Sequence, residues 1–223
     1  MLAAALAIRP MPPDRGEHSA TGWAAVREGF GYLRGRRMLR STFAIDLVAM
    51  IFGMPRALFP ILATTRFHGG DAVVGYLFAA PAVGAFLGAL TGGWVRGVSR
   101  QGTAVLWAVV AWGAGIAAFG LAGDDLPLAV VFLAFAGAAD VVSAIFRSTI
   151  LQVTVPDHLR GRLSGIHILV VTGGPRLGDL EAGLVAQWFT PAISVVSGGI
   201  LCIVGAAAVA LAYPELRRYR AGT

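Results

Sequence analysis

Six long apolar stretches, separated by short polar connections, dominate this sequence. They lie at about residues 42–66, 72–95, 103–122, 127–151, 163–187 and 190–213. A helix needs about 20 apolar residues to cross the hydrocarbon core of a bilayer, and each stretch meets that length. Hydrophobic residues make up 57% of the chain and charged residues only 13%, a composition that excludes a soluble protein. The sequence therefore predicts an all-α membrane protein with six transmembrane helices.

Four segments are expected along the chain. Residues 1–8 are apolar but too short to span a bilayer, and no basic region precedes them as a secretory signal would require. We interpret them as the end of a preceding helix. Residues 9–40 are a polar linker in which Trp23, Val26, Phe30 and Leu33 share one face of an expected interfacial helix. Residues 41–213 form the six-helix bundle, and 214–223 form a tail.

Arginine is concentrated in every second connection. The regions before the first stretch, between the second and third, between the fourth and fifth, and after the sixth hold most of the 18 basic residues. The opposite connections hold Asp71, Asp124 and Asp125. Positive residues stay on the cytoplasmic side of a membrane. The pattern predicts a multi-pass protein of the bacterial cytoplasmic (inner) membrane with both termini cytoplasmic.

The same pattern explains the basic charge balance. A net charge of +6 can indicate nucleic-acid binding, but here the arginines are spread over four connections with no aromatic residues interleaved. The expected partner is the lipid bilayer and not nucleic acid. Cys202 is the single cysteine, which excludes an internal disulfide and a multi-thiolate metal site. We expect no metal and no cofactor.

Two segments of the chain resemble each other. Residues 44–52 and 138–146 share Ala, Asp, Val, Ile and Phe at matching positions, and the shared acids are Asp46 and Asp140. The two segments lie three stretches apart, so their helices run in opposite directions. This offset predicts a 3+3 inverted repeat, an arrangement common in secondary transporters.

Charges inside the apolar stretches occur only in the first, fourth and fifth. A charge at the centre of a membrane helix costs about 2.5–3.5 kcal/mol, so these side chains are expected to face a bundle interior or an aqueous cavity. Asp46 with Arg147, and Arg56 with Asp179, are the expected pairs. Substrate or coupling roles and purely structural ion pairs both remain open for the set, which is Asp46, Arg56, Asp140, Arg147, Arg176, Asp179 and Glu181.

Glycine and proline predict two local features. Gly84, Gly88 and Gly92 recur every fourth residue, which indicates close helix packing. Gly173-Gly174-Pro175 beside Arg176 predicts a kink or local unwinding, and Met54-Pro55-Arg56 repeats the Pro-Arg pair in the first stretch.

Two connections carry motifs of a known family. Residues 155–165, VPDHLRGRLSG, resemble the Pro-x-x-x-Arg-Gly-Arg-x-x-Gly loop of major facilitator transporters, with Pro156, Arg160, Gly161 and Arg162 in place. Residues 92–101, GGWVRGVSRQ, are similar to the family's degenerate second copy of Gly-x-x-x-Asp-Arg-x-Gly-Arg-Arg. Gly92 and Arg100 match positions of this motif, whereas Arg96 stands where the acid would be. Residues 146–152 and 176–183 resemble the enterobactin-exporter-like branch, that of transmembrane secretion effectors.

This resemblance covers residues 22–213 and matches the second six helices of a twelve-helix transporter. It implies the C-terminal half of a proton-coupled exporter of small molecules, of drug or siderophore type. A missing N-terminal six-helix half, or self-association, would complete the transporter. A non-transporting membrane partner or truncated remnant is the alternative reading.

An enzyme is a remote alternative. Asp140 and Asp179 faintly resemble an intramembrane aspartyl protease, but Arg176 replaces the first glycine of its Gly-x-Gly-Asp motif. No Gly-x-Ser-x-Gly, His-Glu-x-x-His or Walker motif occurs. We therefore expect no catalytic residue.

Overall fold

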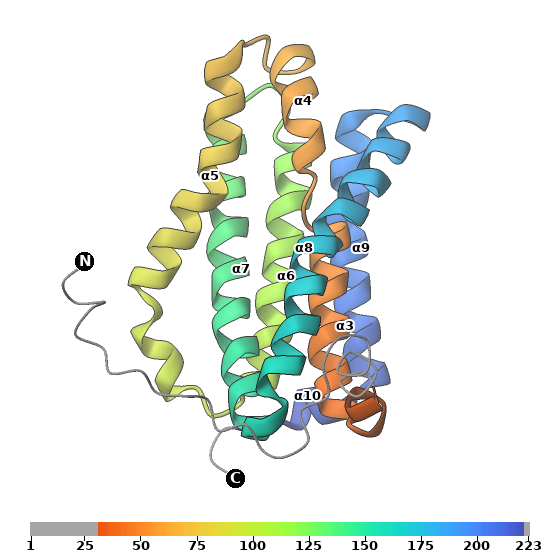
Figure 1. Cartoon of the computed structure of the whole chain (residues 1–223). Helices are drawn as coiled ribbons and strands as arrows, with labels where there is room; N and C mark the ends of the chain where they lie inside the picture. Colours follow the sequence, from red (N-terminus) through yellow and green to blue (C-terminus); the bar gives the residue numbers. More distant parts are fainter. Residues whose placement is uncertain (1–30, 221–223) are drawn as a thin grey trace, which may run out of the picture.

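The computed structural model describes residues 31–220, which are helical apart from short connections and contain no strand (Figure 1). Residues 31–35 form one helical turn ahead of the main elements. The elements that follow are α3 (Arg37–Phe52), η1 (Arg56–Leu58), α4 (Phe59–Thr65), α5 (Asp71–Leu90), η2 (Gly92–Gly97), α6 (Gln101–Leu121), α7 (Leu126–Thr154), α8 (Asp157–Trp188), α9 (Pro191–Ala212) and α10 (Pro214–Arg218).

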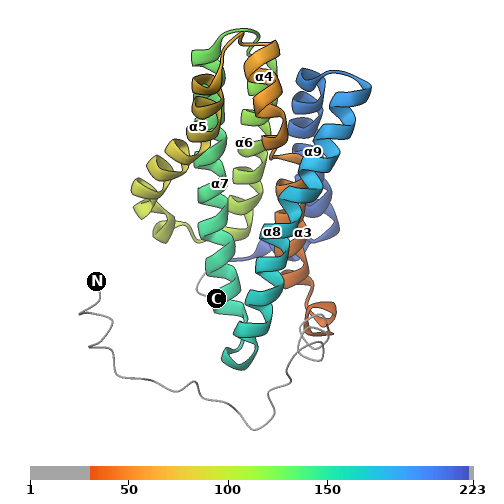
Figure 2. The ribbon, with the colours of Figure 1, turned by 45° about the horizontal axis from the view of Figure 1, so that its top comes forward.

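Five spans in the described part of the chain are long and apolar enough to cross a membrane. They are Arg37–Thr65, Asp71–Leu90, Gln101–Leu121, Leu126–Thr154 and Pro191–Ala212. The sixth predicted stretch is α8, which at 32 residues is long enough but is more polar than the others. It runs beside α3 in both views (Figures 1 and 2). The predicted class, an all-α membrane protein, is confirmed.

Helix packing follows a two-fold pattern. α3 packs mainly on α8 and α9, α7 packs mainly on α5 and α6, and α6 packs on α9. Exchanging α3 with α7, α5 with α8 and α6 with α9 reproduces the same pairings. This pattern agrees with the inverted repeat predicted from the sequence.

Small residues allow α5 and α7 to approach closely. A Cβ atom built at Gly84 would overlap the carbonyl group of Ala134, and one at Gly137 would overlap the carbonyl of Pro81. A Cβ at Gly88 would lie 2.8 Å from Cγ1 of Val141. The packing role predicted for Gly84 and Gly88 is confirmed, whereas Gly92 lies beyond the end of α5.

The first span is broken and the fifth is continuous. Pro55 has no backbone N–H, and α3 ends at Phe52 before the chain resumes as η1 and α4. The Nε1–H group of buried Trp112 donates a hydrogen bond of 2.9 Å to the carbonyl of Gly53, satisfying an acceptor that the break exposes. The local unwinding expected at Pro175 is absent, because α8 remains helical through that residue.

Arginine-bearing connections gather at one end of the bundle. The connection between α5 and α6, the connection between α7 and α8, and helix α10 lie at the lower end of Figure 1. Leu33 is buried at this end in a cluster with Leu39, Val155, Leu159, Leu163 and Ile166. The rest of the expected interfacial helix, including Trp23, Val26 and Phe30, and the expected helix end at 1–8 lie outside the described residues.

The orientation of this end can be tested by cysteine labelling. Ser99 and Asp124 are both exposed and lie at opposite ends of the bundle. If the arginine-rich end is cytoplasmic, a membrane-impermeant thiol reagent added to intact cells modifies Asp124→Cys and spares Ser99→Cys. Cys202 is buried and serves as an internal control that should not react. Modification of Ser99→Cys alone would reverse the predicted topology.

Candidate functional site

A buried ion pair joins α3 to α7. Nη2 of Arg147 lies 3.1 Å from Oδ1 of Asp46, and the two side chains are only 4% and 2% exposed. The predicted pairing of these two residues is confirmed. An uncompensated charge at either position would be costly in an apolar bundle, so each residue needs the other.

Asp140 approaches the same guanidinium. Its Oδ1 atom lies 4.0 Å from Nη2 of Arg147, which follows it about two turns later on α7. Ser143, three residues after Asp140 on the same stripe of α7, is also buried. The two acidic residues of the sequence repeat, Asp46 and Asp140, therefore converge on one arginine.

The cluster has unused hydrogen-bonding capacity. Within the described part of the chain, buried atoms with no hydrogen-bond partner include Nε and Nη1 of Arg147, Oγ of Ser143 and Oδ1 of Asp140. Buried polar groups in proteins are almost always satisfied by protein or by ordered water. This cluster is therefore suited to receive a ligand, water or a proton.

His167 of α8 completes the cluster and was missed by the sequence analysis. Its Nδ1 atom lies 3.6 Å from Oδ2 of Asp46, and its side chain is 36% exposed. The ring packs edge-on against Phe43, with ring centroids 6.2 Å apart. The side chains of Asp46, Arg147 and His167 thus bring three helices, α3, α7 and α8, to one point.

Three hollows follow one another past this cluster. The upper hollow, of about 280 Å³, is lined by residues of η1, α5, α6 and α7, among them Phe78, Trp112 and Asp140. The middle hollow, of about 320 Å³, is lined by Met50, Met54, Arg56, Asp140, Ala144, Arg147, His167, Val171 and Pro175. The lower hollow, of about 160 Å³, lies between α7 and the start of α8 and includes Gln152, Ser164 and His167.

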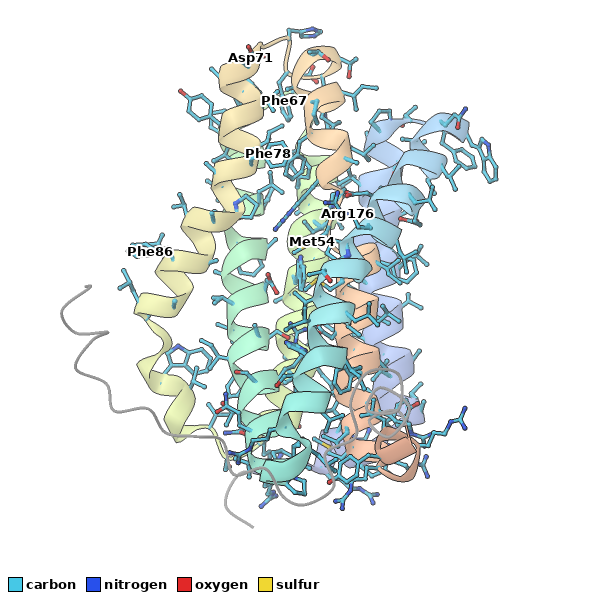
Figure 3. All side chains as sticks on the ribbon, in the orientation of Figure 1. Met54, Phe67, Asp71, Phe78, Phe86 and Arg176 are labelled. Carbon is cyan, nitrogen blue, oxygen red and sulfur yellow. The ribbon has the colours of Figure 1, made fainter. Side chains whose placement is uncertain are left out.

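The remaining predicted site residues surround the break in the first span. Figure 3 labels Met54 and Arg176, both at mid-height of the bundle. Arg56 and Arg176 are exposed, whereas Asp179 and Glu181 are half-buried. Arg56 lines both the upper and the middle hollow.

The expected pairing of Arg56 with Asp179 is wrong. Oδ1 of Asp179 instead accepts a hydrogen bond of 3.2 Å from the backbone N–H of Ala57. After the break at Pro55 the amides of Arg56 and Leu58 donate to backbone carbonyls, whereas the amide of Ala57 donates to the Asp179 carboxylate. Nor does Arg176 form an ion pair with Asp179 or any other described residue.

The family loop motifs lie at the lower end. Pro156 is the N-cap of α8, and Arg160 donates to the carbonyl of Gln152 at 3.0 Å. Gly92 begins η2, Arg100 precedes α6, and Gly161 lies in the first turns of α8. The side chains of Arg96 and Arg162 are outside the described part of the structure.

No group of three or more His, Cys, Asp or Glu side chains in the described residues could hold a metal ion. Asp140 and Asp179, the two carboxylates considered for protease chemistry, each have a different partner. Asp140 lies beside Arg147, and Asp179 is bonded to the backbone of η1. The two carboxylates have different partners, unlike the two carboxylates that share a proton in an aspartyl protease.

Comparison with known proteins agrees with this architecture. The family model of transmembrane secretion effectors matches residues 2–221. The chain is 29% identical over 211 residues to proteins named enterobactin exporter EntS in Escherichia coli (strain SMS-3-5 / SECEC), Shigella boydii serotype 18 and Escherichia fergusonii. The alignments cover 95% of this chain and 50% of each relative. The chain thus spans about half the length of the curated relatives it matches.

The match to the family model runs along nearly the whole sequence, and the six helices carry the charged positions and loop motifs expected of such transporters. The family is one of transporters and not of enzymes. The chain is a multi-pass membrane protein that belongs to the transmembrane secretion effectors of the major facilitator superfamily.

Proposed function

We propose that this chain forms one six-helix half of a secondary active exporter that exchanges protons for a small molecule. The observation that carries the proposal is the convergence of Asp46 and Asp140 on Arg147 beside the middle hollow. Membrane-embedded charges that line a cavity mark ion and substrate pathways in transporters. The family membership supports export as the direction of transport.

In this proposal, the coupling of proton movement to substrate movement depends on how the Arg147 guanidinium is shared between Asp46 and Asp140. With Asp140 ionised, both carboxylates compete for the guanidinium, which holds α3 and α7 together. A proton on Asp140 removes one competitor, so Arg147 then pairs with Asp46 alone and Asp140 is free to move away. Protonation thus changes the attraction across the middle hollow, which is the kind of two-state bias that drives alternating access.

Arg176 and Arg56 are the proposed substrate contacts. Both are exposed, and Arg56 lines two hollows beside the break in the first span. A guanidinium offers a planar fork of donors that suits carboxylates and phenolates. We propose a siderophore or drug-type molecule as substrate, and because the relatives are named as enterobactin exporters, enterobactin is the first molecule to test.

A second six-helix unit would complete the transporter. In an isolated half, Arg56 and Arg176 would meet lipid, at a cost of about 2.5–3.5 kcal/mol for each charge placed near the bilayer centre. α8 also exposes Ile168, Leu169, Leu177 and Leu180 around Arg176, which gives a mixed apolar and charged face. We propose that an N-terminal six-helix half, or a second copy of this chain, covers that face.

Two substitutions test the proposal in proteoliposomes that contain the completed transporter. Asp140→Asn is expected to abolish transport driven by a pH gradient while leaving enterobactin binding intact. Arg176→Ala is expected to weaken enterobactin binding by about tenfold, equivalent to the loss of one charge-assisted hydrogen bond. Uptake into inverted vesicles measures the first effect, and equilibrium binding of radiolabelled enterobactin measures the second.

Asp124→Asn is the matched control, because Asp124 is an exposed acid in the connection between α6 and α7, away from the cluster. It should behave as wild type. If both test variants insert normally and leave transport and binding unchanged, the charges are structural ion pairs and the coupling proposal fails. Absence of transport by any assembly would favour the alternative of a non-transporting membrane partner.

A further inference from the structure

We infer that His167 carries protons between the middle hollow and the lower hollow, and so connects the charge cluster to the arginine-rich end of the bundle. This inference rests on the proton coupling proposed above and adds the route by which the proton leaves. It assigns a role to a residue that the expected set of site charges does not include.

The first support is the position of His167 between two hollows. It is the one residue that lines both the lower and the middle hollow. Further up, Asp140 lines both the middle and the upper hollow, together with Met54 and Arg56. A group able to bind and release a proton therefore stands at each junction along the three hollows. Hollows of about 160–320 Å³ are also large enough to hold several water molecules.

The second support is the state of the imidazole ring. Nδ1 of His167 has no hydrogen-bond partner in the described structure, although it lies 3.6 Å from Oδ2 of buried Asp46. A proton bound at Nδ1 would face a carboxylate oxygen at that distance, which is a hydrogen-bond acceptor. Histidine is the side chain whose ordinary proton affinity lies nearest to physiological pH.

The charged groups around His167 determine where its proton comes from and where it can leave. Asp46 faces His167 from α3, Arg147 and Asp140 face the middle hollow from α7, Arg56 faces it from η1, and Arg160 of α8 lines the lower hollow. Arg160 is already bonded to the carbonyl of Gln152. Asp140 is the proton donor available on the upper side of His167, and the lower hollow provides the exit.

The proton transfer balances without any other reactant. The proton leaves the Asp140 carboxyl, crosses the water of the middle hollow and binds a ring nitrogen of His167, which leaves a carboxylate and an imidazolium. The imidazolium pairs with Asp46 while Asp140 returns to Arg147. Release of the proton to water in the lower hollow restores neutral imidazole. His167 acts here as a proton carrier and makes no covalent bond to substrate.

Access to the residue can be measured on the chain itself. In a Cys202→Ser background, His167→Cys is expected to react with a membrane-impermeant thiol reagent supplied from the arginine-rich side of oriented vesicles. The same reagent supplied only from the opposite side should modify it at least tenfold more slowly. The control, His68→Cys between α4 and α5, should show the reverse preference. Equal reaction of residue 167 from both sides, or no reaction at all, would overturn the proposed route.

The proton step is tested with the completed transporter in liposomes that contain a pH-sensitive dye, with enterobactin as substrate. His167→Ala is expected to slow substrate-driven proton movement by about 100-fold, the usual contribution of one acid–base group, while enterobactin counterflow is retained. Imidazole added to the lower-hollow side should restore the proton movement. His68→Ala should show neither the defect nor the rescue.

The outcomes separate the two proposals. If wild type moves enterobactin without protons, the proposed coupling fails and the role of His167 fails with it. If wild type is coupled and His167→Ala equals it, only the role of His167 is wrong. Joint loss of counterflow and proton movement without rescue by imidazole would make His167 a structural residue.

Discussion

Replacing Arg147 with alanine is expected to lower the free energy of unfolding by about 3–5 kcal/mol, the cost of leaving one partner of a buried ion pair uncompensated. Asp46 is 2% exposed and would lose its charged partner from α7 in the buried interior. The measurement is equilibrium unfolding of the purified chain in mixed lipid–detergent micelles, followed by circular dichroism. Asp46→Ala should have an effect of similar size.

The double variant and an exposed pair provide the controls. Asp46→Ala combined with Arg147→Ala removes both charges, so its loss should be smaller than the sum of the two single losses. Arg37 and Glu215 form an ion pair of similar length, 3.1 Å, but their side chains are 58% and 41% exposed. Arg37→Ala should therefore cost about 1 kcal/mol or less. Additive losses for the buried pair would contradict the coupling between Asp46 and Arg147.

Gly84→Ala is expected to disrupt the packing of α5 on α7. The added Cβ would overlap the backbone carbonyl of Ala134, which cannot turn aside as a flexible side chain could. The helices would have to separate, and overpacking of this kind costs about 1–3 kcal/mol. The loss should appear in the same unfolding measurement, together with faster proteolysis at the ends of α5.

Gly75→Ala is the matched control in the same helix. A Cβ at Gly75 meets nothing within 4 Å, so this substitution should be neutral or slightly stabilising, because alanine favours helices more than glycine does. Equal effects at both positions would indicate that helix propensity, and not the approach of α5 to α7, determines the outcome. Gly137→Ala should resemble Gly84→Ala, since its Cβ would overlap the carbonyl of Pro81.

Much of the fold follows from hydropathy, because membrane helices must satisfy their own backbone and must be about 20 residues long. The stretches at 72–95 and 103–122 correspond closely to α5 and α6. The pairing of Asp46 with Arg147 could also be predicted, since buried charges of opposite sign at similar depth have few other partners.

Features that depend on local backbone geometry or helix placement were harder to predict. Pro55 breaks its helix while Pro175 does not, although both precede an arginine. At the break, the backbone N–H of Ala57 donates a hydrogen bond to Asp179, which takes the place of the expected contact with Arg56. His167 carries no formal charge at pH 7, and its proximity to Asp46 arises from the packing of α8 on α3. The available signal was a histidine inside a stretch long enough to span the bilayer.

The hydrogen bond from Trp112 to Gly53 has a mechanical consequence. Bending the chain at the break would leave an indole N–H and a carbonyl unpaired in a nonaqueous interior, where each unpaired group costs several kcal/mol. The segment at Gly53 is therefore expected to travel with α6. Motion during a transport cycle would then concentrate between α3 and α7, where the ion pair of Arg147 with Asp46 can be remade. Protonation of a group in this contact would determine whether the two helices stay paired.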